Sequence, residues 1–172
     1  MFQSFLIVML LLAKAPKPAA EAPKPAETGI IAGTVASGSE ETISQPVRVV
    51  LLSAQYTNLW NTDVQQRLDV YWERYKPAFA IQKEFFFEIS RRAQREALDA
   101  IVFRMRRDPS SNVSEYMKET PVGGTFEFKN VPFGEYKILA LGKIGGQDVI
   151  WQDSIDVHSP VPQFLELRKR LP

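Results

Sequence analysis

Short segments of alternating apolar and polar residues lie near both ends of the chain and predict β-strands. In the clearest of them, Phe126 and Phe128 share one face and the polar residues around them take the other, which is the period of an extended strand. Segments of this kind cover Ile30–Val35, Val47–Leu52, Thr125–Lys129, Tyr136–Leu141, Val149–Val157 and Phe164–Arg168. Turns that contain glycine and proline separate them, so the pattern predicts an antiparallel β-sandwich of about seven strands.

A long middle segment has apolar residues at helical spacing instead. One stripe holds Val64, Leu68, Tyr71, Trp72 and Tyr75. We expect a first helix capped by one of residues 61–63, a break or kink at Pro77, and a second helix from about Phe79 to Arg107, ended by Asp108-Pro109. The segment is too long for a loop, so it predicts a two-helix insertion over about residues 60–108 in a mainly β (α+β) fold. The pattern leaves open whether this insertion packs on its own sandwich or on another molecule.

Three stretches of the predicted sandwich carry a family resemblance. They are Gly29-Ile-Ile-Ala-Gly-Thr-Val35, Pro46-Val-Arg-Val-Val-Leu51 and Gly124-Thr-Phe-Glu-Phe-Lys-Asn-Val-Pro-Phe-Gly-Glu-Tyr136. Together they resemble the carboxypeptidase regulatory-like domain, over roughly residues 29–53 and 123–169. The resemblance implies a transthyretin-like (prealbumin-like) fold of seven strands. It also implies an accessory or interaction role, because members of that family are usually non-catalytic modules.

The N-terminal residues predict export. Phe5–Leu12 is an unbroken apolar run followed by Ala13-Lys14-Ala15, which is the pattern of a signal peptide over residues 1–15. The run is shorter than the roughly 20 apolar residues that span a bilayer. Repeated prolines predict an extended linker over residues 16–28, before the domain at 29–172. We expect a periplasmic or cell-surface protein of a bacterial envelope, which contacts the membrane only if its N-terminus stays uncleaved.

Composition and charge exclude several classes of function. The chain has 21 basic and 20 acidic residues, so it lacks the strongly basic character of a nucleic-acid-binding protein. It has no cysteine and a single histidine, His158, in the polar segment Asp156–Pro160. Thiol catalysis, iron–sulfur ligation and zinc fingers are therefore excluded. Because no motif brings a nucleophile to a base or gathers metal ligands, we expect no enzyme, no catalytic residue, no metal and no cofactor.

Three consecutive phenylalanines, residues 85–87, stand in the second predicted helix. Successive helical residues are about 100° apart, so three in a row cannot all face one surface. One apolar stripe holds Phe86, Ile89, Ala93, Ala97, Ala100 and Ile101, and a second holds Phe87, Leu98, Val102 and Met105. Either both stripes are covered within the molecule, or at least one ring faces solvent, a partner protein or a second copy of the chain.

The candidate partner surface combines the second stripe with nearby positive charge. It consists of Phe85, Phe87, Leu98, Val102, Arg104 and Arg107. Arginines late in a helix can attract an acidic partner or anionic lipid, or they can simply offset the helix dipole. The first hypothesis is therefore a non-catalytic exported accessory module whose helical insertion contacts a partner protein or forms a homodimer.

A carbohydrate- or small-ligand-binding module is the alternative hypothesis. Its binding surface would use the exposed aromatic residues among Trp60, Trp72, Tyr116 and Trp151. Sandwich domains that bind sugars stack them on such rings. An exposed coplanar pair of rings would favour this alternative, whereas a continuous apolar patch on the helices would favour the partner surface.

Overall fold

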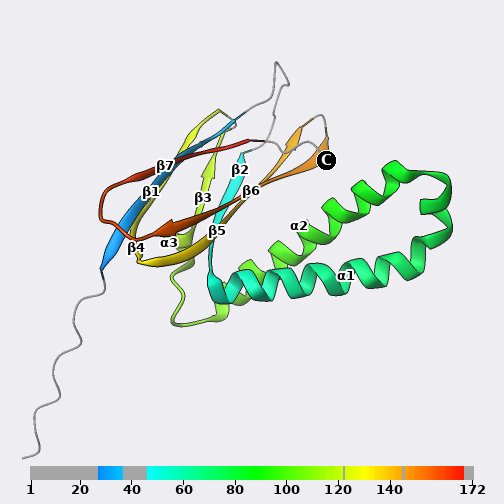
Figure 1. The fold of residues 1–172 in the computed structure, drawn as a ribbon, viewed down its shortest axis with the longest axis horizontal. Helices are drawn as coiled ribbons and strands as arrows, with labels where there is room; N and C mark the ends of the chain where they lie inside the picture. The colour runs from blue at the N-terminus through cyan, green and yellow to red at the C-terminus, as the bar shows by residue number, and fades with distance from the viewer. Residues whose placement is uncertain (1–26, 37–45, 122, 145, 169–172) are drawn as a thin grey trace, which may run out of the picture.

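Two β-sheets form the body of the molecule. The computed structural model describes residues 27–36, 46–121, 123–144 and 146–168, which contain seven strands (Figure 1). One sheet has the order β4-β1-β7 and the other the order β3-β2-β5-β6. The strands are β1 (Thr28–Val35), β2 (Val47–Ser53), β3 (Met117–Thr120), β4 (Thr125–Pro132), β5 (Gly134–Ile144), β6 (Gln147–Val157) and β7 (Gln163–Leu167).

Two long helices are inserted between β2 and β3. They are α1 (Ala54–Ile81) and α2 (Lys83–Arg107), and a one-turn helix α3 (Val113–Tyr116) follows them. This arrangement confirms the predicted α+β fold with a helical insertion. The strand pairs are antiparallel with one exception, because β1 and β7 run parallel, so an entirely antiparallel sandwich is wrong at that pair.

The sandwich core lies between the two sheets. Its largest fully buried side chains include Trp151 and Phe128, and each alternates along its strand with residues that face away. The remaining members are apolar residues of every strand except β3, with Ile31, Val35, Val47, Val49, Leu51, Phe126, Val131, Ile138, Ala140, Val157 and Leu167 among them. The period-two pattern of the sequence therefore corresponds to burial between the sheets.

A tight corner carries the chain from β4 in one sheet to β5 in the other. Asn130 has a φ of 56° and Gly134 a φ of 149°, which are left-handed conformations that these two residue types tolerate. The Tyr136 hydroxyl donates a hydrogen bond of 2.9 Å to the Pro132 carbonyl and closes the corner. A turn that contains proline and glycine is thus present between these strands, and β4 itself continues to Pro132.

The helices cover the outer face of the four-stranded sheet and form a third layer (Figure 1). Val50, Leu52 and Leu139 point away from the sandwich core and are fully buried beneath them. The helical side of this second core consists of Tyr56, Trp60, Ala97, Leu98, Ile101, Val102 and Met105. The insertion therefore packs on its own sandwich. Strand β2 is buried on both faces, which explains its nearly continuous apolar sequence.

The start of the insertion differs from the prediction. Helix α1 begins at Ala54, directly after β2, and not at a cap among residues 61–63. The extra two turns are helical because Tyr56 and Trp60, four residues apart, both pack onto the sheet. The helix also continues past Pro77 to Ile81, where burial of Phe79 offsets the lost backbone hydrogen bond. Helix α2 begins at Lys83, later than Phe79, and ends at Arg107 as expected.

Strand β3 has no counterpart in the predicted strands. Its sequence, Met117-Lys-Glu-Thr120, is mostly polar, and it pairs along one edge with β2. A short polar edge strand gives almost no hydrophobic signal, because only one of its sides is hydrogen-bonded and little of it is buried.

The predicted signal peptide and all of the linker up to residue 26 lie outside the described residues.

Candidate docking surface on the helical hairpin

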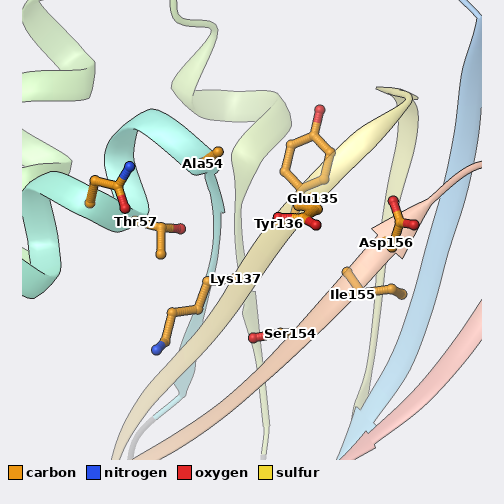
Figure 2. Close-up of a pocket in the computed structure, with 9 residues that line it drawn as sticks. Ala54, Thr57, Glu135, Tyr136, Lys137, Ser154, Ile155 and Asp156 are labelled. Carbon is orange, nitrogen blue, oxygen red and sulfur yellow. The ribbon is translucent and has the colours of Figure 1, made fainter.

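The cleft between the first turn of α1 and strands β5 and β6 has a volume of ≈ 530 Å³ (Figure 2). Glu135 and Asp156 are direct cross-strand partners at its rim, and both are exposed. Like charges placed opposite each other on a sheet are destabilising and do not by themselves make a binding site. Among the described residues, no group of three or more histidine, aspartate or glutamate side chains could hold a metal ion.

The single histidine lies near this cleft, and its described contacts include no nucleophilic side chain. The His158 side chain is exposed, and Nδ1 lies 3.1 Å from the Asp156 carbonyl oxygen and 3.8 Å from its carboxylate. Both of these contacts are with Asp156, so the described geometry does not pair the imidazole with a serine hydroxyl.

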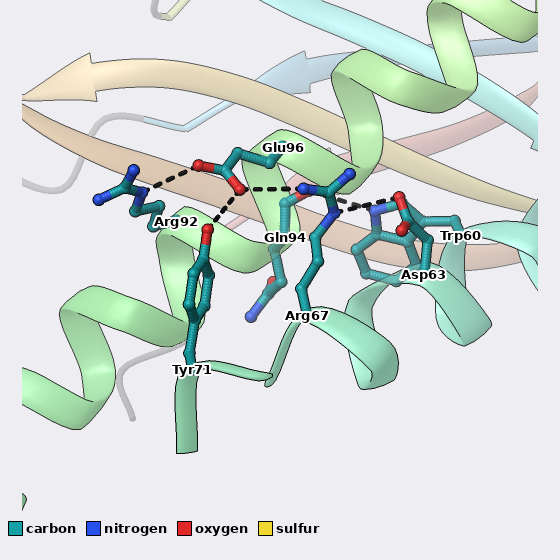
Figure 3. A network of polar contacts seen from close by, with 7 residues as sticks. All are labelled: Trp60, Asp63, Arg67, Tyr71, Arg92, Gln94 and Glu96. Atoms are coloured by element: carbon teal, nitrogen blue, oxygen red, sulfur yellow. Dashed lines mark hydrogen bonds and ion pairs between the residues drawn. The ribbon is translucent and has the colours of Figure 1, made fainter. Parts of the chain in front are cut away.

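A polar network ties the two long helices together midway along their length (Figure 3). Glu96 of α2 accepts hydrogen bonds from Tyr71 (2.6 Å) and Arg67 (3.0 Å) of α1 and from Arg92 (2.9 Å) of its own helix. Burial alone would raise the pKa of Glu96, but these three donors outweigh it and hold the pKa below its usual value. The hydrogen bond to Glu96 and, secondarily, burial raise the pKa of Tyr71. The network fixes the hairpin in one geometry.

Beyond this network the hairpin extends past the end of the sheet (Figure 1). Aromatic side chains fill its distal half. Phe79 is buried at the centre, stacked on Trp72 with ring centroids 5.4 Å apart and in edge contact with Phe86 at 5.7 Å. Phe85 also contacts Phe79, with ring centroids 5.7 Å apart, and Tyr75 packs edge-on against Phe85 at 5.6 Å. In this half of the hairpin the two helices are therefore packed by contacts between aromatic rings and not by contacts with the sheet.

One side of this aromatic cluster is exposed. Trp72, Phe86 and Phe87 have exposed fractions of 44%, 40% and 43%, and successive ring contacts of 6.5 Å and 6.1 Å join them. We call these three residues the ring patch. Ile81, at the end of α1, is 84% exposed. The described part of the chain leaves one side of these rings open to solvent, and large contiguous apolar patches usually mark sites of interaction.

The ring patch continues the helix face that packs on the sheet. Phe87 and Met105 are eighteen residues apart, which is about five turns, and Leu98 lies about 20° from both. Met105 and Leu98 are buried in the second core against the sheet, whereas Phe87 lies outside that core and is exposed. The same apolar face is therefore covered at the base of the hairpin and uncovered at its tip.

The residues of the predicted partner surface therefore lie in different environments, some buried and some exposed. Leu98 and Val102 are buried against the molecule's own sheet, so their assignment to a partner surface is wrong. Phe85 is half-buried between the helices, and Phe87 is exposed in the ring patch. Arg104 and Arg107 are exposed at the other end of α2, where the Arg107 guanidinium lies 4.2 Å from the centre of the Phe103 ring.

The predicted ligand aromatics do not form one surface. Trp60 and Trp151 are buried in the outer and inner cores, so neither can stack on a sugar, and that part of the prediction is wrong. Tyr116 is half-buried at the junction of both cores. Only Trp72 is exposed, and the ring stacked on it, Phe79, is buried. The described structure therefore gives no exposed coplanar pair among these four.

Sequence reasoning missed two members of the exposed tip. The spacing places Phe86 on one apolar stripe with Ile89 and Ala93, and it gives Ile81 no role. Ile89 and Ala93 are indeed buried, but Phe86 lies one turn further out, where only the other helix remains as a neighbour. The available signal was position: these residues flank the turn between two antiparallel helices, where fewer elements can cover a side chain.

Comparison with known proteins gives distant likenesses only. No family model matches the chain, and no curated protein sequence matches it. Among solved structures it is similar to a Pseudomonas aeruginosa protein described as a "putative carbohydrate binding protein". That match has 15% identity and a TM-score of 0.34, and it covers 84% of this chain and 90% of the other. It is also similar to the pilus backbone RrgB of Streptococcus pneumoniae, with 13% identity, a TM-score of 0.29, and coverage of 76% and 34%. Likenesses of this size carry nothing about ligand or partner.

The described helices also bear on contact with a membrane. None of them is both long enough and apolar enough to cross a bilayer.

Proposed function

We propose that this chain is an exported, non-catalytic accessory module of the carboxypeptidase regulatory-like kind, and that the tip of its helical hairpin docks onto a protein surface. One observation carries the docking role. The helix face that packs Leu98 and Met105 onto the molecule's own sheet continues past the sheet and exposes the ring patch, Trp72, Phe86 and Phe87. Aromatic rings of this kind are enriched at protein interfaces and supply much of their binding energy.

The rigidity of the hairpin supports the same proposal. The Glu96 network and the stacked rings around Phe79 hold the exposed rings in place before any partner binds. A surface that is ordered in advance loses less entropy on association. The base of the hairpin is anchored in the second core, so a partner at the tip is held at a fixed distance from the sandwich.

Two further arguments support the non-catalytic and exported parts. The described contacts of the only histidine are both with Asp156, which leaves no base-activated nucleophile among them. The apolar run Phe5–Leu12 before Ala13-Lys14-Ala15, with the proline-rich stretch after it, favours export and a tethering linker.

A photo-crosslinking pair tests the docking role. Phe87 in the ring patch and Phe164 on the outer face of β7 are both exposed, at 43% and 69%, and each can be replaced by benzoylphenylalanine with little effect on folding. In cells that make the protein, illumination should give a discrete crosslinked species from position 87 and none from position 164.

Position 164 is the matched control, because it presents an equally large apolar side chain on the opposite sheet. Equal crosslinking from both positions, or none from position 87, would refute a docking surface at the hairpin tip. The mass of the adduct identifies the occupant: twice the chain mass indicates a second copy, and any other discrete protein mass indicates a different partner.

A further inference from the structure

Two opposite charges flank the ring patch on the face of α2 that carries Phe87. Glu84 lies three residues before Phe87 and Arg91 four residues after it, which places both within about 60° of Phe87 around the helix. Glu84 is exposed and Arg91 is half-buried. Neither has an ion-pair partner within the part of the chain that the structure describes.

The neighbouring arginines already have partners. Arg92 binds Glu96 at 2.9 Å, and Arg95 binds Asp148 of β6 at 2.7 Å. Within the described residues, Arg91 and Glu84 have no such partner, and neither has the exposed Glu88. The spacing of Glu84 and Arg91 on either side of Phe87 is nearly symmetrical. A surface that carries both signs symmetrically about a central apolar residue is complementary to itself.

We infer that the occupant of the ring patch is a second copy of this chain, with two α2 helices packed antiparallel about Phe87. This inference rests on the proposed function and names its partner. Antiparallel packing about one residue brings the position three before it close to the position four after it on the other helix. Glu84 of each copy then faces Arg91 of the other, twice by symmetry. The two Phe87 rings meet at the centre, and Phe86 and Trp72 close the sides.

A groove beside the β5–β6 hairpin adjoins this contact. It has a volume of ≈ 400 Å³, and its lining includes Ile89, Arg91, Arg95 and Gln147. Along the axis of α2, Arg91 and Arg95 lie about 6 and 12 Å from Phe87, so the groove adjoins the contact between the two α2 helices.

Charge reversal in the full chain tests the inference, with mass followed by light scattering over a dilution series. The unmodified chain should form a dimer. Glu84→Arg and Arg91→Glu each place like charges together twice, and each should raise the dimer dissociation constant by more than about 100-fold. Mixing the two variants restores both ion pairs, so the mixture should form a heterodimer, and the double variant should form a homodimer again.

The rescue separates this geometry from misfolding or from non-specific association, since neither would be repaired by a second charge reversal. Glu115→Arg, an exposed reversal on α3 far from the tip, is the control and should leave the dimer unchanged. A monomeric chain at every concentration would overturn the inference, as would a dimer that both single reversals leave intact or single losses that mixing does not repair. If the chain is monomeric while position 87 still crosslinks to another protein, the second copy is wrong and the docking role stands.

Discussion

Glu96 shows at the scale of a single residue how the hairpin is held for its role. Its side chain is 25% exposed and lies between α1 and α2, where the carboxylate accepts hydrogen bonds from Tyr71, Arg67 and Arg92. Three donors on one carboxylate can only be satisfied while the carboxylate is ionised. The stability that it contributes therefore depends on pH in a defined direction.

Replacing Glu96 with glutamine should destabilise the protein by about 1–2 kcal/mol at pH 7, because the neutral amide accepts fewer and weaker bonds. The folded-state pKa of Glu96 is lowered, so its contribution is complete above the ordinary glutamate pKa of about 4.3 and is lost as the pH falls through the lower folded value. Urea unfolding of both proteins at pH 7 and at pH 3 should show the gap closing at the lower pH.

Glu73→Gln provides the control on the same hairpin, because the Glu73 side chain is exposed and outside the network. It should leave the unfolding midpoint unchanged at both pH values. A gap between the wild type and Glu96→Gln that persists at pH 3 would show that the amide acts through shape and not through lost charge.

At the scale of one element, α2 carries residues of equal hydrophobicity in opposite environments on one face. Leu98 is 1% exposed against the sheet, and Phe87, at nearly the same angle around the helix, is 43% exposed. Leu98→Ala should cost about 2–5 kcal/mol in unfolding free energy, because it leaves a cavity in the outer core. Phe87→Ala should cost less than about 1 kcal/mol in the isolated chain, because solvent replaces a partly solvated ring. Thermal or urea unfolding at low protein concentration measures both.

Comparing the two substitutions separates a side chain that stabilises the fold, Leu98, from one that mediates docking, Phe87. Phe87→Ala should weaken the association measured by light scattering without loss of stability, whereas Leu98→Ala should lower the stability and leave the association of the folded chain intact. Equal destabilisation by the two substitutions at a concentration where the chain is monomeric would place Phe87 in the folding core and remove it from the docking surface.

The same helix shows what hydrophobic spacing can predict. The stripe Phe87, Leu98, Val102 and Met105 identifies a face correctly, because helical period is a local property of the chain. Which part of that face is covered depends on where the sheet ends, and this is set by strand lengths and register in distant parts of the sequence. Leu98 and Phe87 therefore could not be told apart from the sequence. The end of α2 at Arg107 was predictable because Asp108-Pro109 is a local signal, whereas the start of α1 at Ala54 was not, because β2 runs into it without a turn.

At the scale of the whole molecule, the hairpin covers a sheet face that cannot face water. Val50, Leu52 and Leu139 are fully buried beneath it, and burying a side chain of this size stabilises a fold by about 1.5–3 kcal/mol. Three such residues amount to a large share of the 5–15 kcal/mol that ordinarily separates folded from unfolded domains. The two layers of the sandwich and the helical layer should thus unfold together.

Removing residues 54–116 tests whether the helices complete the fold. Because β2 and β3 are antiparallel neighbours, a short Gly/Ser turn can join Ser53 to Met117 and keep both strands. The deletion removes Trp60 and Trp72, so Trp151 becomes the only tryptophan and its fluorescence reports the sandwich core directly. We expect its urea transition to become broad and shifted to low denaturant. The same deletion with Val50, Leu52 and Leu139 replaced by threonine should recover a cooperative transition, since the outer face can then be solvated. A sharp transition in the deletion without those replacements would make the hairpin an independent addition, and its tip would then be held by the Glu96 network and the stacked rings alone.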